Sequence, residues 1–160
     1  MKRGRVSGWR SELVEVRESP LHGLGIFAVT DIPEGTVWWS AELADTITIS
    51  RGQFETLAAS ASSPATDAMM SAIQEYSIYL AAFDLMVLIP DNGRYVNHSD
   101  DPNSGALVAG TELRSVALRD IVAGEEILED YGTYDHCPWE GIAPEFHDPT
   151  VEPQLGVSFR

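Results

Sequence analysis

The sequence predicts a mainly β fold of the α+β type, with a small helical insert near the middle of the chain. Short strand-like segments bounded by turn residues occupy residues 13–39 and 85–132. Between them, residues 51–80 are rich in Ala, Met, Gln, Glu and Leu, which favours helices. A chain of 160 residues suits one domain with one modest core.

The first part of the chain predicts a flexible arm followed by three short strands. Residues 1–11 carry four basic residues and two glycines, and we expect them to form a flexible basic arm. The alternation of residues 13–17 predicts a strand, and residues 26–29 predict a second one. The turn sequence Asp-Ile-Pro-Glu-Gly at 31–35 then leads into a strand at 37–39.

The middle of the chain predicts two helices, over residues 51–60 and 66–80. A Ser-Ser-Pro sequence at 62–64 separates them. Thr66 is the expected cap of the second helix, because a hydroxyl can accept a bond from an unpaired backbone N–H. This composition predicts the helical insert at 51–80.

Strands return after residue 84. Segments 85–90 and 94–96 flank an Asp-Asn-Gly turn, and segments 105–109 and 113–118 predict a hairpin around Gly110-Thr111. Residues 136–160 hold four prolines and show little periodicity. We expect this last segment to form a tail that is either loosely ordered or packed on the body.

Charge limits the classes of partner. The formal net charge is -15, and all 25 acidic residues lie after residue 10. Such a body repels nucleic acid and anionic membranes, and it attracts a basic peptide or protein. An acidic surface that serves only solubility, or that suits a saline habitat, is the alternative. The lone cysteine, Cys137, excludes an internal disulfide and a multi-cysteine zinc site, and it fits a reducing compartment.

Three segments carry most of the chemical information. The first is His22-Gly-Leu-Gly-Ile-Phe-Ala28, where two glycines allow a tight turn and a close approach of the backbone to a ligand. It is not a dinucleotide-binding fingerprint, because the third glycine is missing and a short strand follows. Taken alone, this Gly-x-Gly sequence is a common turn.

The second segment is Arg94-Tyr-Val-Asn-His-Ser-Asp-Asp-Pro-Asn103, which places several polar side chains directly after a predicted strand. A polar loop is one interpretation. Polar groups at such a position are costly unless each is paired, which favours a functional one. A metal site is disfavoured, because His98, Asp100 and Asp101 are nearly adjacent and no second His or Glu cluster has ligand spacing.

The third segment is Gly124-Glu-Glu-Ile-Leu-Glu-Asp-Tyr-Gly132, a turn and a short strand that ends in a tyrosine. An edge strand with an aromatic anchor is the simpler interpretation. In this order and spacing, however, the three segments resemble the SET-domain family. That family carries a Gly-x-Gly near its start, a segment such as Arg-Phe-Ile-Asn-His-Ser-x-x-Pro-Asn, and a later Gly-Glu-Glu-Leu-x-x-Asp-Tyr-Gly. The resemblance covers residues 13–135.

The resemblance implies a SET-domain β-clip fold of short strands, with a pseudoknot formed by the Asn-His segment and the segment after it. The domain would span residues 12–135, between the arm at 1–11 and a tail at 136–160 that lacks the zinc site of many relatives. It also implies a protein-lysine N-methyltransferase, similar to histone-lysine methyltransferases, with S-adenosyl-L-methionine as methyl donor. The enzyme would act within the cell, in the cytoplasm of a prokaryote or the nucleus or cytoplasm of a eukaryote.

The resemblance also implies roles for individual residues. Tyr131 would be the catalytic tyrosine beside the transferred methyl group. The expected cofactor-binding residues are His22, Gly23, Leu24, Gly25, Tyr95, Asn97, His98 and Trp139. The expected residues of the substrate channel are Tyr76, Tyr79, Tyr134 and Phe146. A plain core or tail-docking role is the alternative for Tyr76, Tyr79, Tyr134, Trp139 and Phe146.

The expected partner is a basic protein or peptide, such as a histone, a DNA-packaging protein or a ribosomal protein. No direct contact with nucleic acid or membrane is expected, no metal site is assigned, and the oligomeric state is left open. A SET-fold module that has lost catalysis and only binds a basic peptide is the rival hypothesis. The presence of Asn97, His98 and Tyr131 together favours the enzyme.

Overall fold

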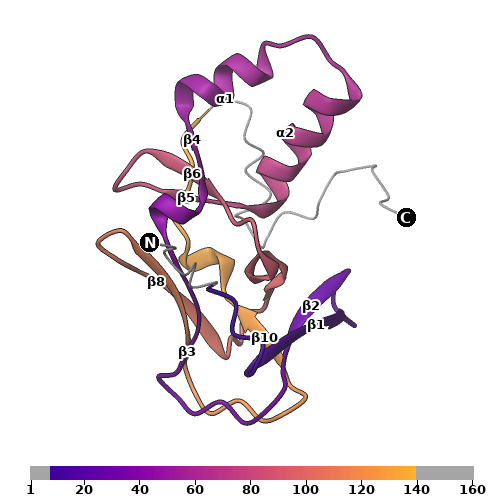
Figure 1. Ribbon diagram of the computed structural model, residues 1–160, viewed down its shortest axis with the longest axis vertical. Coiled ribbons are helices and arrows are strands. Elements are labelled where there is room, and N and C mark those ends of the chain that lie inside the picture. Colours follow the sequence, from indigo (N-terminus) through magenta and orange to yellow (C-terminus); the bar gives the residue numbers. More distant parts are fainter. Residues whose placement is uncertain (1–7, 140–160) are drawn as a thin grey trace, which may run out of the picture.

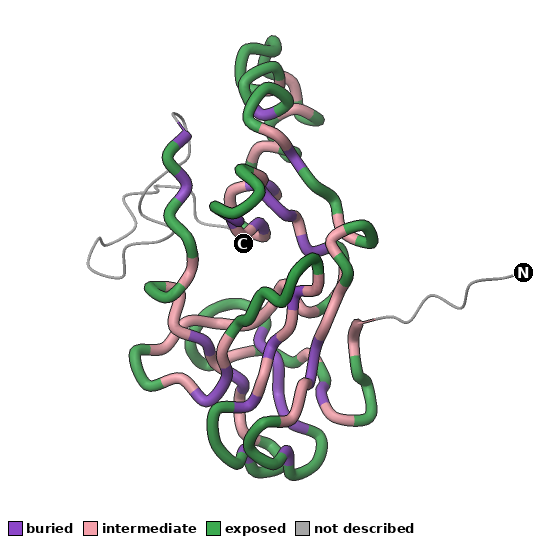
Figure 2. The backbone as a smooth tube through the Cα atoms, turned by 90° about the vertical axis from the view of Figure 1, so that its left-hand side faces the viewer, coloured by how far each residue is buried: buried purple, intermediate pink, exposed green. Residues whose placement is uncertain are grey.

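The computed structural model describes residues 8–139, which form two β-sheets, two α-helices and three short 3-10 helices. Figure 1 shows the larger sheet forming the lower body and the helices lying with the smaller sheet above it. Figure 2 shows that buried positions concentrate in the strands, whereas the helices at the top are mostly exposed. The mainly β fold with a helical insert is therefore confirmed.

The larger sheet has seven strands, and six of them follow the order β1-β2-β10-β8-β9-β3. Its members are β1 (Val14–Glu18), β2 (Leu24–Ala28), β3 (Val37–Glu42), β7 (Asn97–His98), β8 (Ser104–Ala109), β9 (Glu112–Ala117) and β10 (Glu126–Glu129). The expected hairpin is present, because β8 and β9 pair in antiparallel fashion. Gly110 turns the chain there with a φ of +64°, which a residue without a Cβ adopts at little cost.

Strand β10 brings the three motif segments together. It pairs antiparallel with β2, parallel with β7 and parallel with β8. Leu128 lies opposite Asn97, and Glu129 lies opposite both His98 and Ser104. Pairing between such distant segments places the end of β10 beside the Asn-His segment, where the resemblance expects the pseudoknot.

Together with flanking residues, the insert predicted at 51–80 forms a larger helical insert at 43–88, which contains the smaller sheet of order β4-β6-β5. Its elements are β4 (Ile47–Ser50), α1 (Arg51–Ala58), α2 (Pro64–Tyr76), β5 (Ser77–Leu80) and β6 (Leu85–Leu88), preceded by the 3-10 helix η1 (Leu43–Asp45). Both predicted helices exist, but the expected cap of the second one was wrong. Ser63 is the N-cap, and Thr66 is the third residue of the helix, where it completes a reciprocal capping box.

Two predicted boundaries were also wrong. The second helix ends at Tyr76, and residues 77–80 form β5 because they pair with β6. Residues 94–96 do not form a strand, because the chain makes the 3-10 helix η2 (Asn92–Tyr95). The Asp91 carboxylate caps η2 by accepting a bond of 2.9 Å from the Gly93 N–H, and it also accepts one from the Trp39 indole.

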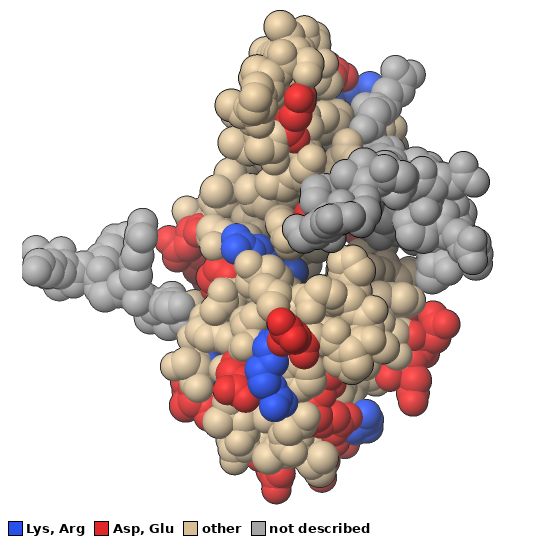
Figure 3. Space-filling model, turned by 90° about the vertical axis from the view of Figure 1, so that its right-hand side faces the viewer, with Lys and Arg blue, Asp and Glu red and all other residues tan. Residues whose placement is uncertain are grey.

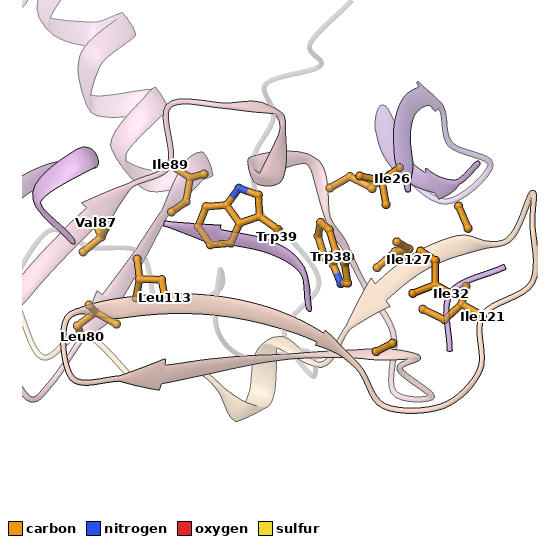
Figure 4. Packing of buried hydrophobic residues seen from close by; sticks show 13 residues of the cluster. Ile26, Ile32, Trp38, Trp39, Leu80, Val87, Ile89, Leu113, Ile121 and Ile127 are labelled. Atoms are coloured by element: carbon orange, nitrogen blue, oxygen red, sulfur yellow. The ribbon is translucent and has the colours of Figure 1, made fainter. Parts of the chain in front are cut away.

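The main core lies between the two sheets. Trp38 and Trp39 are both buried although they are neighbours in β3, where side chains normally alternate between faces. A register shift between Val37 and Trp39 explains this, since a β-bulge re-aims the side chains next to it. Figure 4 shows Trp38 directed toward Ile26 and Ile127 of the larger sheet, and Trp39 toward the side of the smaller sheet.

A second, smaller core lies inside the helical insert. It contains Ile49, Phe54, Ile73, Tyr79, Met86, Cys137 and Trp139. Residues near the end of the described chain therefore pack against the insert. Within residues 8–139, neither helix has the length and apolar composition needed to cross a membrane.

Candidate functional site

A cavity of about 110 Å³ lies between the helical insert and the larger sheet. The end of α2, the helix η2, the hairpin β8–β9 and the end of β10 all contribute to its wall. Its polar and aromatic lining includes Tyr76, Arg94, Glu129, Tyr131 and Tyr134. Ile78, Ile89, Leu107, Val108 and Leu113 give it an apolar side. An apolar wall with a few convergent polar groups is the usual lining of a ligand site.

Tyr131 follows β10 directly and opens the 3-10 helix η3 (Tyr131–Thr133). Its hydroxyl donates to the Val96 carbonyl over 2.5 Å, and its ring stacks on Tyr134 at a centroid distance of 5.4 Å. Burial, and then the charge of Glu129, raise the pKa of the Tyr131 phenol above its ordinary value. Tyr131 is therefore a neutral hydrogen-bond donor at physiological pH and not a base.

His98 holds Tyr131 in place from the other side. Its ring lies 5.2 Å from the Tyr131 ring, and its Nδ1 accepts a bond of 3.1 Å from the Tyr131 backbone N–H. The proton of the neutral ring is then on Nε2, which lies 3.2 Å from the Asp100 carboxylate. His98 thus fixes the start of η3 relative to β7.

His98, Asp100 and Asp130 form a group whose potential ligand atoms lie within 4.8 Å of one another. Two of those atoms already accept backbone bonds, since His98 Nδ1 takes the Tyr131 N–H and Asp130 Oδ1 takes the Gly132 N–H. Asp100 is 90% exposed. These bonds assign the group to orienting the turn after β10, and we assign it no metal ion.

Asn97 connects β7 to the Gly-x-Gly segment. Its side-chain NH₂ donates to the Leu24 carbonyl over 3.1 Å, the His22 carbonyl over 3.2 Å and the Glu126 carboxylate over 2.8 Å. No bond to its side-chain oxygen is found within residues 8–139. This arrangement makes Asn97 the link between the second and first motifs, and it leaves an acceptor available.

The two glycines of the first motif have different roles. Gly23 has a φ of +48°, so the turn itself requires a residue without a Cβ. A Cβ on Gly25 would lie 2.2 Å from the Glu126 carboxylate. Gly25 therefore makes room for the Glu126 side chain, which accepts bonds from Ser19 and Asn97, and the close approach expected for a ligand is made by a carboxylate of the protein.

Glu129 is the residue of the cavity wall that the sequence interpretation missed. Its side chain is only 1% exposed. One carboxylate oxygen accepts a bond of 2.8 Å from Ser104 Oγ, which itself accepts a bond of 2.7 Å from the indole of Trp38. The Tyr134 hydroxyl donates to the other oxygen. One sequence signal was available: Glu129 is two residues from Ile127 in β10 and so shares its buried face.

Arg114 of the cavity wall is paired with Glu112. Arg94 is the second cation of the wall. Its guanidinium lies 4.8 Å from the Tyr95 ring centre and 5.2 Å from that of Tyr76, and it donates to the Tyr95 hydroxyl over 2.7 Å. Its Nε is buried and has no partner in the described part of the chain. Tyr95 packs edge-on against Tyr76, with the ring centres 6.0 Å apart. Tyr95 therefore supports the cavity wall through its contacts with Arg94 and Tyr76.

The structure separates the other predicted aromatic residues. Tyr76 and Tyr134 line the cavity, whereas Tyr79 and Trp139 lie in the core of the helical insert. Tyr79 and Trp139 pack edge-on at 5.7 Å, and both donate to Asp84, over 2.8 and 2.9 Å. The bond to Asp84, with burial second, raises the pKa of Tyr79 to about 12. Both positions fit the core or tail-docking role that was the alternative for Tyr79 and Trp139. Phe146 lies outside the described residues.

Comparison with known proteins gives one family and a set of similar folds. The family model described as SET domain matches residues 23–132. No curated protein matches the sequence. A solved structure from Plasmodium falciparum, of a protein assigned provisionally as a histone methyltransferase, is similar with a TM-score of 0.54 and 21% identity. That match covers 78% of this chain and 96% of the other.

The structure of ctPRC2 in an autoinhibited conformation bound to S-adenosylmethionine is also similar. The TM-score is 0.57 and the identity is 22%, over 77% of this chain and 15% of the other. At these identities the two structures establish a shared fold, while the family model covers the three motif segments except His22. The chain belongs to the SET domain family.

Proposed function

We propose that this protein is an S-adenosylmethionine-dependent protein-lysine N-methyltransferase that acts on a basic protein or peptide. The observation that carries the proposal is that the Asn-His segment and the Glu-Asp-Tyr segment meet at β10. The two segments pair there, and Tyr131 enters the wall of a cavity lined by aromatic rings. The membership in the SET domain family supports the same reaction class.

The residues present suit the proposed cofactor. S-adenosylmethionine supplies a methyl group on a positively charged sulfur, and it also carries an ammonium, a carboxylate and an adenine. The unoccupied side-chain oxygen of Asn97 suits the ammonium, with the backbone of residues 22–25 beside it. The buried, unpartnered Nε of Arg94 suits the carboxylate. The backbone of His98 remains the expected partner of the adenine.

The residues of this chain would act mainly by positioning. Tyr131 is held from three directions, by Val96, His98 and Tyr134, so its ring and hydroxyl have a fixed place. A fixed, water-poor cavity holds a reacting amine in line with its target and lowers the entropy cost of the transfer. Burial of the amine also favours its neutral form, which is the form that attacks.

The charge of the surface supports a basic substrate. Figure 3 shows acidic side chains spread over the sheet body, with few charged atoms over the helical insert on the same face. An acidic body of this kind attracts histone-like, DNA-packaging or ribosomal proteins and lowers the affinity for nucleic acid. We propose an intracellular location, where such substrates occur. Loss of catalysis with retained binding of a basic peptide is the second candidate.

Tyr131→Phe tests the proposal. Purified protein is incubated with methyl-labelled S-adenosylmethionine and, in parallel, core histones, protamine and ribosomal proteins, and labelled lysine is sought by mass spectrometry. The variant is expected to lose at least about tenfold in rate while its affinity for the cofactor stays within about threefold. Tyr79→Phe removes the same atom outside the cavity and should keep the rate. Cofactor binding without transfer to any of these proteins would favour the binding module.

A further inference from the structure

Glu129 is a buried carboxylate without a cationic partner. No Lys, Arg or His within residues 8–139 forms an ion pair with it. Its two bonding partners, Ser104 and Tyr134, are neutral hydroxyl groups. A buried carboxylate is costly unless it is paired, and charged residues are almost never fully buried otherwise. A bound cation would therefore stabilise Glu129, which has no ion-pair partner within residues 8–139.

We propose that Glu129 is the group that captures the ammonium of the entering lysine side chain, so that the cavity selects a primary aliphatic ammonium. The identity of the ligand as a lysine rests on the proposed function, but the selection of a cation rests on the cavity alone. Glu129 lies in the cavity wall, and a carboxylate has acceptor sites beyond the two that are used.

The rest of the cavity suits the stem of such a side chain. Ile78, Leu107 and Leu113 line one side, and the rings of Tyr76 and Tyr134 line another. The volume of about 110 Å³ is of the same order as an engineered protein cavity of roughly 150 Å³ that holds benzene. Aromatic faces also attract a cation that passes over them. The cavity thus combines an apolar and aromatic lining with a buried carboxylate.

Arg94 and Arg114 are the cations of the cavity wall, and the contacts of both argue against neutralisation of Glu129. Arg114 is paired with Glu112. Arg94 contacts neighbouring aromatic rings instead. Its guanidinium lies over the rings of Tyr76 and Tyr95 and donates to the Tyr95 hydroxyl. The group also has no ion pair with any carboxylate in the described residues. Arg94 and Glu129 are therefore charges of the cavity wall that no ion pair within residues 8–139 neutralises, and they suit an anionic and a cationic group of different ligands.

A purely structural role for Glu129 makes a different prediction. Glu129 joins Trp38, Ser104 and Tyr134 in a hydrogen-bonded chain. A glutamine side chain at this position can accept a bond from one of the two hydroxyls and donate a bond to the oxygen of the other. A structural role would therefore survive Glu129→Gln. Capture of a cation would not, because the charge is lost. A carboxylate beside an ammonium also favours its protonated form, which binds but does not attack, so Glu129 should lower KM and should not raise kcat.

The test uses n-butylammonium as probe and neutral n-butanol as its counterpart, followed by NMR of the tyrosine rings. Wild-type protein should bind n-butylammonium in saturable fashion and at least about tenfold more tightly than n-butanol. Glu129→Gln should lose about tenfold or more for the cation and keep its weak affinity for the alcohol. Glu34→Gln, at an exposed carboxylate that does not line the cavity, should stay within about twofold of wild type.

Equal affinity of the wild-type protein for the two probes would overturn the proposal without any variant, so a folding defect in Glu129→Gln cannot hide the result. Equal affinity of a folded Glu129→Gln variant for n-butylammonium would overturn it as well. The test separates failure of this proposal from failure of the proposed function. Selective binding of the cation without methyl transfer would support the role of Glu129 and contradict only the methyltransferase activity.

Discussion

Asn103 holds the strand that delivers the site, and its replacement should be among the most destabilising single changes. The residue is 1% exposed. Its side-chain NH₂ donates to the Glu126 carbonyl over 2.8 Å and to the Glu125 carboxylate over 2.9 Å, and its side-chain oxygen accepts from the Leu128 N–H over 2.8 Å. The amide side chain thus adds three bonds to β10 beside its pairings with β7 and β8.

The size of the effect follows from these three bonds. Asn103→Ala removes two bonds to the backbone and one to a charged group, and it leaves the Leu128 N–H and the Glu126 carbonyl without these partners. At about 1 kcal/mol for each neutral bond and about 1.5–3 kcal/mol for the charged one, the expected loss in free energy of unfolding is about 3–5 kcal/mol. For a chain of this size, that loss corresponds to a fall in Tm of roughly 10 °C.

Urea denaturation followed by circular dichroism measures this loss. With a slope of about 2 kcal/mol per molar, the midpoint should move down by about 2 M at an unchanged slope. Asn92→Ala, at an exposed asparagine of η2, is the matched control and should move the midpoint little. A loss below about 1 kcal/mol for Asn103→Ala would refute the reasoning, since β10 would then be held by other contacts.

Two further substitutions test the motif loop and the second core. Gly25→Ala should displace the Glu126 carboxylate, because the new Cβ would lie 2.2 Å from it, and calorimetry should show weaker binding of S-adenosylmethionine together with a lower Tm. The reasoning fails if both values stay at those of wild type. Bonds from Trp139, and then Tyr79, lower the pKa of Asp84. Its stabilising effect is therefore present above the ordinary carboxyl pKa of about 3.9 and is lost as pH falls through the lowered value. Asp84→Asn should flatten the dependence of Tm on pH below about 4, and an unchanged acid slope would contradict this.

The turns could be predicted from the sequence because they depend on local chemistry. Gly35, Gly110 and Gly124 all adopt positive φ, and each was expected to lie in a turn. The three motif segments were recognised for the same reason, since their residue types and spacing are visible along the chain. Their convergence on β10 required the pairing of distant strands, which the family resemblance supplied.

Two strands of the smaller sheet, β4 and β5, escaped prediction because they depend on pairing with β6, which lies within the strand predicted at 85–90. Ser77 follows α2 without a helix-breaking residue, and β5 exists because it pairs with β6. Tyr79 and Trp139 could not be placed from sequence for a related reason, since an aromatic side chain serves a core or a channel equally well until its neighbours are known. Glu129 was missed because local patterning does not anticipate a carboxylate on a buried strand face.

Binding of S-adenosylmethionine tests the central claim most directly, because it requires no knowledge of the substrate. Purified protein is titrated with the cofactor in a calorimeter, with Asn97→Ala and the exposed Asn92→Ala as a matched pair. The account predicts saturable binding to one site that is retained in Asn92→Ala and lost in a folded Asn97→Ala variant. Absence of binding to folded wild-type protein, or equal binding by both variants, would contradict it.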